Sequence, residues 1–259
     1  MRRTVGVLPA AGLGKRLKPY NGLKELLPVG YYPSEKGPVP MVVSQYVMNA
    51  LRAARVQDLY FVISPQKWEI ARFFTNGSRF GMNCCYLFQD EPEGMPGALD
   101  SAYPWVRDSV VCMGMPDTIM QPTHCFAQLL EEHRKKAADL TLGIFPTETP
   151  QSLAPVHLEP GTGRVLEIFD KPQTTTYYNT WGVAVWEPSF TELLHHYVSH
   201  ASRVHGQELL LSNVFLEAIK QNLRVYGTQF EDGTLFDIGT FEGLRYARAI
   251  LENVEQTYC

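Results

Sequence analysis

The sequence alternates between short apolar runs and segments in which apolar residues recur at helical spacing. The runs of strand length are Thr4 to Leu8, Leu59 to Ser64, Cys84 to Phe88, Val110 to Met115 and Leu140 to Phe145. The helical segments between them are Met41 to Ala54, Gln66 to Phe74, Gly97 to Val106 and Thr123 to Lys136. Strands that alternate with helices pair as a parallel sheet, because each right-handed crossover packs its helix back onto the sheet. The pattern therefore predicts an α/β fold with a mostly parallel, doubly wound sheet.

The second half of the chain breaks this alternation. Three short strands without intervening helices are expected at Pro155 to Leu158, Val165 to Phe169 and Trp181 to Trp186. They predict a small antiparallel extension beside the main sheet. Further helices are expected at Ser189 to His200, Glu208 to Gln221 and Thr240 to Asn253. The sequence has no internal repeat and no long polar linker, which predicts one domain over residues 1–259.

The charge balance narrows the classes of partner. A net charge of −4 gives no broad basic field for nucleic acid, and no stretch is as long and apolar as a membrane span. Anions must instead be bound by local cations, which cluster at Lys15, Arg16, Lys18 and Lys24. The opening MRRTVGVLPAAG is too short in apolar residues for a signal peptide, which predicts a cytoplasmic protein. We expect small anionic ligands and no binding to nucleic acid or to a membrane. Whether the chain forms a homo-oligomer stays open.

The cysteines do not indicate a disulfide framework or a zinc site. They are odd in number, scattered and without a CxxC pair, at Cys84, Cys85, Cys112, Cys125 and Cys259. The neighbouring Cys84 and Cys85 lie on a predicted strand. We therefore expect mostly buried, reduced thiols.

A stretch rich in glycine and cations, AAGLGKRL, follows the first predicted strand. Open parallel sheets bind ligands at the carboxyl ends of their strands, so this loop lies where a ligand is expected. It is not a dinucleotide fingerprint, because Leu17 occupies the third glycine position, and not a Walker loop, because Pro9 occupies the first. Gly12 and Gly14 make backbone amides approachable, and the flanking cations suit a polyphosphate.

This loop and the downstream KELLPV segment resemble the sugar-1-phosphate nucleotidylyltransferases, whose motifs are (L/P)-A-G-x-G-T-R and P-K-x-(L/M)-L-P-V. The sequence looks most like the UTP:glucose-1-phosphate uridylyltransferases and the glucose-1-phosphate thymidylyltransferases. The resemblance implies a Rossmann-like, GT-A-like sheet with an antiparallel extension on the sugar side. The residues that it assigns to the triphosphate are Ala10, Ala11, Gly12, Gly14 and Lys15. The resemblance also implies two catalytic residues: Arg16, which would bind the leaving pyrophosphate, and Lys24, which would bind the α-phosphate.

Some residues depart from the family pattern. Lys15 stands where the family has Thr, and Leu23 replaces the usual Pro before the lysine. The interval from Arg16 to Lys24 is also shorter than the family pattern, and Tyr31 to Val39 looks like an insertion. The phosphate loop is therefore expected to close differently.

A later segment, QDEPEGMPGAL, resembles the element with which the family reads the base. The resemblance assigns Gln89 and Gly94 to nucleotide binding. A neutral amide offers a donor beside an acceptor, which suits the edge of uracil or thymine. The alternative is a polar loop before a helix.

Two acids resemble the family's metal ligands. Asp117 ends the segment MGMPD, and Asp237 lies in DIGT. Mg²⁺ is commonly held by one or two carboxylates together with phosphate oxygens, so the pair implies a magnesium site, with Asp117 also next to the nucleotide. The alternatives are a turn cap at Asp117 and a helix cap at Asp237.

The segment FDKP resembles the family's E-K-P element, which binds the sugar and its phosphate. It assigns Asp170 and Lys171 to the acceptor, and makes Lys171 catalytic as well. Thr180 and Gly182, in TWGV, resemble the strand that completes the sugar pocket. Trp181 is either a core residue or a pocket wall.

Together these residues predict an enzyme that transfers a nucleotidyl group from UTP or dTTP to a sugar 1-phosphate. The nucleotide half is expected over about 1–145 and the acceptor half over about 146–259. Ala154 and Pro155 stand where the family has an aromatic-glycine pair that touches the sugar, and Pro155 has no N–H to donate. Two alternatives stay open: a cytidylyltransferase that uses a non-sugar phosphate or phosphonate, and an inactive regulatory homologue that binds a nucleotide sugar.

Overall fold

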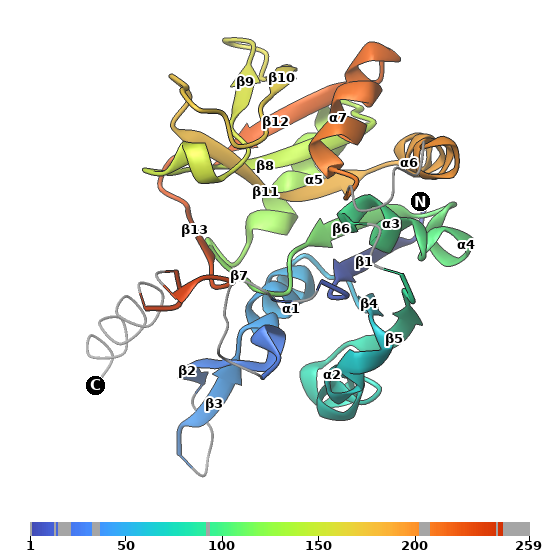
Figure 1. The fold of residues 1–259 in the computed structure, drawn as a ribbon, viewed down its shortest axis with the longest axis vertical. Helices are drawn as coiled ribbons and strands as arrows, with labels where there is room; N and C mark the ends of the chain where they lie inside the picture. The colour runs from blue at the N-terminus through green and yellow to red at the C-terminus, as the bar shows by residue number, and fades with distance from the viewer. Residues whose placement is uncertain are drawn as a thin grey trace.

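The centre of the molecule is a mostly parallel sheet. The computed structural model describes residues 2–12, 14, 22–32, 37–91, 94–201, 208–241 and 243–245. Within them, seven strands form the sheet: β1 (Thr4–Pro9), β4 (Asp58–Ile63), β5 (Asn83–Phe88), β6 (Val110–Gly114), β8 (Leu140–Pro146), β11 (Asn179–Trp186) and β12 (Val225–Gln229). Their spatial order is β12-β8-β11-β6-β1-β4-β5 (Figure 1). All neighbours pair in parallel except β11, which is antiparallel to β6 and β8. The predicted fold class is confirmed.

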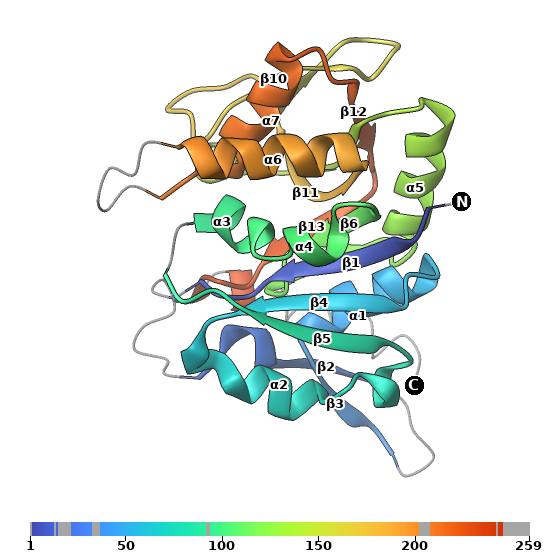
Figure 2. The same cartoon turned by 90° about the vertical axis from the view of Figure 1, so that its right-hand side faces the viewer.

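Helices cover both faces of this sheet, and Figure 2 shows α3, α4 and α6 on the side toward the viewer. The helices of that face are α3 (Gly94–Asp100), α4 (Tyr103–Val106), α6 (Pro188–His200) and α7 (Leu211–Lys220). The helices of the opposite face are α1 (Ser44–Ala53), α2 (Trp68–Phe74) and α5 (Cys125–Lys135). Because both faces are covered, the central strands are continuous apolar runs such as VGVL in β1 and VVCM in β6.

Three two-stranded antiparallel sheets flank the centre. They are β2 (Pro28–Tyr32) with β3 (Val39–Val42), β7 (Thr118–Gln121) with β13 (Thr234–Asp237), and β9 (Val156–Leu158) with β10 (Val165–Ile168). The β9–β10 pair confirms an antiparallel extension. The segment that looked like an insertion contributes to the β2–β3 pair, and residues 33–36 lie outside the described residues.

Some predicted elements differ from those observed. The strand expected at Trp181 to Trp186 belongs to the central sheet and not to the extension, because Val183 to Val185 are buried on both faces. The helix expected from Met41 begins at Ser44, since β3 includes Met41 and Val42. The helix expected over Gly97 to Val106 is divided into α3 and α4, with Pro104 in the first turn of α4, where its missing N–H costs nothing. Strands β2, β3, β7, β12 and β13 were not predicted at all.

Four of the five cysteines are among the described residues, and all four are free thiols. Cys112 and Cys125 are buried, as expected, whereas Cys84 is half-buried and Cys85 is exposed. The expectation of a buried pair is wrong because β5 is an edge strand, whose side chains are less covered than those of central strands. Within the described part of the chain, no helix has both the length and the apolar character needed to cross a bilayer.

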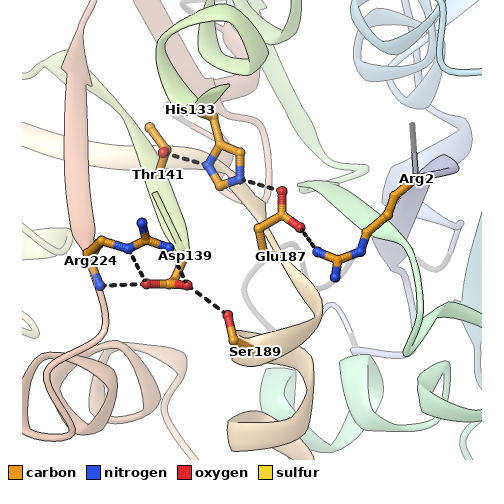
Figure 3. A network of polar contacts seen from close by, with 7 residues as sticks. All are labelled: Arg2, His133, Asp139, Thr141, Glu187, Ser189 and Arg224. Atoms are coloured by element: carbon orange, nitrogen blue, oxygen red, sulfur yellow. Dashed lines mark hydrogen bonds and ion pairs between the residues drawn. The ribbon is translucent and has the colours of Figure 1, made fainter. Parts of the chain in front are cut away.

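A network of polar contacts joins elements at the amino ends of the parallel strands (Figure 3). Glu187, just after β11, accepts a hydrogen bond from Arg2 at 2.7 Å and lies 3.6 Å from Nε2 of the buried His133 on α5. Asp139, just before β8, accepts hydrogen bonds from Arg224 and from Ser189. The network therefore cross-links the end of the sheet that lies opposite the loops at the carboxyl ends of the parallel strands.

Candidate active site

A cleft of about 510 Å³ opens at the carboxyl ends of the parallel strands. Nine of the predicted site residues line it: Ala11, Gly12, Gly14, Lys24, Gln89, Gly94, Asp117, Asp170 and Asp237. They come from loops after β1, β5 and β6, from the first residues of the short helix Lys24–Leu26 and of α3, from the end of β13 and from the segment after β10. The fold therefore brings residues from both halves of the sequence to one cavity, as open parallel sheets do.

The glycine loop leaves β1 directly into this cleft. A Cβ atom on Gly12 would meet no atom of the described residues within 4 Å, so within that part of the chain the backbone there is open to a ligand. Gly14 has φ of +62°, a left-handed conformation that favours glycine. Ala10 is buried and donates its N–H to the Val62 carbonyl at 2.7 Å, which anchors the loop to β4. Lys15 and Arg16 lie outside the described residues.

Lys24 and Asp117 form an ion pair in the cleft. Nζ of Lys24 lies 2.5 Å from Oδ2 of Asp117, and the two side chains are 16% and 11% exposed. Burial acts to lower the pKa of Lys24, but the combined attraction of Asp117, Glu25 and Asp237 outweighs it and raises that pKa above its ordinary value. Lys24 is therefore a cation at neutral pH.

Asp237 is held beside Asp117 by strand pairing. In the antiparallel β7–β13 pair Asp237 lies opposite Thr118, and the N–H of Ile238 donates to the Asp117 carbonyl at 3.1 Å. One oxygen of Asp237 also accepts the Gly239 N–H at 2.8 Å, so a turn-capping role coexists with its place in the cleft. Two neighbouring carboxylates that face a cleft fit the donor set of a divalent cation such as Mg²⁺. Among the described residues, no cluster of three or more acid, histidine or cysteine ligands competes with this pair.

Two buried side chains line the cleft with donors that have no partner in the described part of the chain. Gln89 is 8% exposed and is fixed after β5 by its backbone bond to the Ile63 carbonyl, yet its Nε2 has no hydrogen-bond partner among the described residues. The same is true of Nε1 of Trp181, which is also 8% exposed and packs edge-on against Phe215. Trp181 is thus both a core residue and a cleft wall. Buried donors are normally satisfied, so both are candidates to bind a ligand's acceptor atoms.

A second wall of the cleft comes from residues 208–212, which the sequence did not indicate. Gly94 forms a parallel bridge with Leu209, and a Cβ at Gly94 would lie only 2.5 Å from the Leu209 carbonyl oxygen. Gly94 has φ of +85°, so glycine is required there for both reasons. The helix expected from Glu208 begins at Leu211, which leaves the preceding residues extended along the cleft. No local signal marks this wall, because it depends on contact with Gly94.

The predicted acceptor residues are placed less uniformly. Asp170 lines the cleft, but Lys171 is exposed, has φ of +45° and donates its N–H to the Leu153 carbonyl, and it is not part of the lining. Thr180 is 2% exposed and bonds to the Trp181 carbonyl, behind the cleft surface. Gly182 also lies behind it, where a Cβ would meet Leu235 at 2.6 Å.

Glu25 is a cleft residue that the motifs did not single out. It is 1% exposed, and one of its oxygens accepts a hydrogen bond from Nζ of Lys67 at 2.6 Å. Its position in the sequence could have indicated it. A carboxylate between Lys24 and two leucines lies in a segment that is expected to be buried, and a buried carboxylate needs a cation or a hydrogen-bond donor as its partner.

Comparisons with known proteins agree with this architecture. The Nucleotidyl transferase family model matches residues 5–254. A glucose-1-phosphate thymidylyltransferase of Neisseria meningitidis is 24% identical over 254 residues, which cover 96% of this chain and 83% of the relative.

Two solved structures share the fold. A Bacillus anthracis structure in complex with a sucrose has a TM-score of 0.82 at 19% identity, and covers 96% of this chain and 95% of its own. A UDP-glucose pyrophosphorylase complexed with UDP-glucose has a TM-score of 0.79 at 17% identity, with 98% and 99% covered.

Proposed function

Because the chain belongs to the nucleotidyl transferase family, we propose that it transfers a nucleotidyl group from UTP or dTTP to a sugar 1-phosphate. A phosphate oxygen of the acceptor attacks the α-phosphorus of the triphosphate in line, the bond from that phosphorus to the oxygen that bridges to the β-phosphate breaks, and pyrophosphate leaves. No covalent enzyme intermediate is needed. The products are a nucleotide sugar and pyrophosphate.

The observation that carries this proposal is the group formed by Lys24, Asp117 and Asp237 in one cleft with the Gly12–Gly14 turn. Phosphoryl chemistry depends on positioning and on neutralising the charge of the phosphates. A buried cation paired with one acid, in the same cleft as a second acid and approachable backbone amides, supplies both requirements.

Each residue then has a role in the proposed reaction. Backbone amides of the glycine loop would hold the triphosphate, Arg16 would bind the leaving pyrophosphate, and Lys24 would neutralise the α-phosphate and the incoming phosphate. Asp170 would hold sugar hydroxyls, and Lys171, although outside the cleft lining, would bring the sugar phosphate into line. The division into a nucleotide half, residues 1–145, and an acceptor half, residues 146–259, belongs to the same proposal.

Asp117 and Asp237 would hold Mg²⁺, which when bound supplies positive charge against the triphosphate oxygens. We expect chelation of divalent ions to abolish pyrophosphate release and added Mg²⁺ to restore it. Asp237→Asn should raise the Mg²⁺ concentration needed for half-maximal rate by about tenfold or more, because one carboxylate ligand is lost. A rate that is insensitive to chelator would contradict the metal assignment.

Gln89 would read the base through its amide, whose Nε2 has no partner among the described residues, since uracil and thymine present acceptors beside a donor. Two buried donors, at Gln89 and Trp181, then face acceptor atoms of the nucleotide sugar. The proposal favours a pyrimidine for this reason.

The decisive experiment is a pyrophosphate-release screen that crosses the common nucleoside triphosphates with sugar 1-phosphates and small phosphate esters. Release with UTP or dTTP and a hexose 1-phosphate supports the proposal. Release only with CTP and a non-sugar phosphate supports the second candidate, which is favoured by Ala154 in the cleft and by Pro155, which has no N–H. Binding of a nucleotide sugar without release in any pair would indicate a regulatory homologue.

A further inference from the structure

A second ion pair lies behind the Lys24–Asp117 pair, and the proposed reaction assigns it no role. Lys67 ends η3 (Pro65–Lys67), the turn after β4, and its Nζ lies 2.6 Å from Oε1 of Glu25. Glu25 follows Lys24 on the short helix η2 (Lys24–Leu26). The side chains of Lys67 and Glu25 are only 8% and 1% exposed, so this pair is buried more deeply than Lys24 and Asp117.

The four groups alternate in charge: Lys67, Glu25, Lys24 and Asp117. Burial raises the pKa of Glu25 and lowers that of Lys67, and in each case the attraction of the partner opposes the effect of burial. Glu25 also attracts Lys24, whose own partner is Asp117. Oε2 of Glu25 has no hydrogen-bond partner among the described residues, so within that part of the chain the carboxylate depends on its hydrogen bond from Lys67.

We propose that Lys67 is a positioning residue for nucleotidyl transfer. By forming the ion pair with Glu25, it keeps Lys24 available to pair with Asp117 and to bind the phosphates. The proposal rests on the function proposed above, in which Lys24 acts on the α-phosphate. Without Lys67, the buried carboxylate of Glu25 keeps no ion-pair partner among the described residues, which is strongly unfavourable. Lys24, adjacent in the chain, is the described cation that Glu25 already attracts, and it is drawn away from Asp117.

The test compares Lys67→Met with the double variant Glu25→Gln/Lys67→Met. Lys67→Met removes the charge and keeps most of the side-chain volume. We expect kcat to fall by about tenfold or more, the usual scale for removing a partner that orients an active-site group. KM for the triphosphate should change by less than about twofold, because the loss concerns charge that develops in the transition state.

The double variant separates this role from two others. The amide that Glu25→Gln introduces carries no charge to draw Lys24 away, so we expect kcat to recover to within about threefold of the wild type, within the range of coupling energies of contacting residues. A double variant as slow as Lys67→Met would show that Lys67 acts directly on the substrate and would overturn the proposal. An unchanged kcat in Lys67→Met would overturn it as well.

Folding is checked by circular dichroism and thermal melting. If Lys67→Met does not fold, the double variant decides alone, since near wild-type turnover supports the proposal and a retained loss contradicts it. Lys220→Met, at an exposed lysine of α7 remote from the cleft lining, is the matched control and should keep the wild-type rate.

A spectroscopic measurement separates failure of this inference from failure of the proposed function. The ammonium signal of Lys24, identified in ¹⁵N spectra by its loss in Lys24→Arg, should shift in Lys67→Met and return in the double variant. If the wild type releases no pyrophosphate from any pair, the function is wrong and this signal still decides the role of Lys67. A Lys24 signal that does not move in Lys67→Met overturns the inference, whatever the turnover.

Discussion

At the scale of single residues, the cleft is defined by charges that are buried and paired before any substrate arrives. Lys24 is paired with Asp117, and the combined attraction of Asp117, Glu25 and Asp237 raises the pKa of Lys24 despite burial. Gln89 and Trp181 present buried donors without partners among the described residues. These groups are ordered by the fold itself, so little reorganisation is needed when phosphates and a base bind.

Lys24→Ala tests the central cation. We expect turnover to fall by about two orders of magnitude, the usual scale for losing one contact that stabilises developing charge, while the fold is retained. Steady-state pyrophosphate release and thermal melting measure the two effects. Lys220→Ala, on the exposed face of α7, is the control, and a Lys24→Ala enzyme at wild-type rate would remove Lys24 from the mechanism.

Gln89→Met tests the base-reading amide, because methionine keeps the length of the side chain but has no amide. We expect kcat/KM for the preferred triphosphate to fall by about tenfold, the scale of one lost hydrogen bond in a buried site. Discrimination against purine triphosphates should shrink with it. Gln128→Met, on α5 and away from the cleft lining, should leave both quantities unchanged. Equal loss toward every triphosphate would mean that Gln89 does not read the base.

At the scale of elements, the position of β13 determines where Asp237 lies, and β13 packs against the surface of β11. Leu235 of β13 packs directly over Gly182 of β11, and the register of β13 with β7 then places Asp237 opposite Thr118. A one-residue change in this register would turn Asp237 to the other face of the pair. The glycine that resembled a sugar-pocket residue thus has a packing role that is visible in the structure.

Gly182→Ala tests this packing. The new Cβ would lie 2.6 and 2.7 Å from the two methyl carbons of Leu235, closer than real contacts allow. We expect a loss of about 1–3 kcal/mol in the free energy of unfolding, the cost of overpacking a core, measured by chemical denaturation. Gly182→Ala combined with Leu235→Ala should be more stable than the sum of the two single effects predicts. Additive effects would contradict the contact.

At the scale of the whole molecule, the two edges of the sheet carry different kinds of polar groups. The carboxyl ends of the strands open into the cleft, whereas the amino ends are closed by the network of Figure 3. In that network, hydrogen bonds from Arg224 hold the pKa of Asp139 below its ordinary value, and burial lowers the pKa of His133 although Glu187 opposes this. This closed edge links α5, β8, β11 and β12.

The lowered pKa of His133 predicts how stability depends on pH. Below about pH 6.5, the ordinary pKa of histidine, the unfolded chain binds a proton that the folded chain takes up only at lower pH. The contribution of His133 is therefore fully present above this pH and is lost as the pH falls toward the lowered value. His133→Gln should make the free energy of unfolding less dependent on pH in this window, as measured by denaturation at several pH values. A variant that keeps the wild-type slope would place the titration elsewhere.

Local patterns in the sequence were enough to predict the alternating strands and helices and the loops at their ends. Buried strands appear as apolar runs because both of their faces are covered. Surface helices show apolar residues with a period of about 3.6 residues because only one of their faces is buried. Lys24, Gln89 and Asp117, which follow or flank such elements, were indicated by the resemblance to the family motifs and not by this periodicity. It missed β12 and β13, whose short segments carry weak periodicity, and it assigned β11 to the wrong sheet.

The sequence by itself determined the fold class and the residue types available at the carboxyl edge of the sheet, since both depend on neighbours along the chain. The tertiary structure alone decided that Asp237 lies beside Asp117, that residues 208–212 wall the cleft against Gly94, and that Lys67 holds Glu25. These contacts join segments far apart in the chain. Their formation depends on strand order, register and burial, which no local pattern encodes.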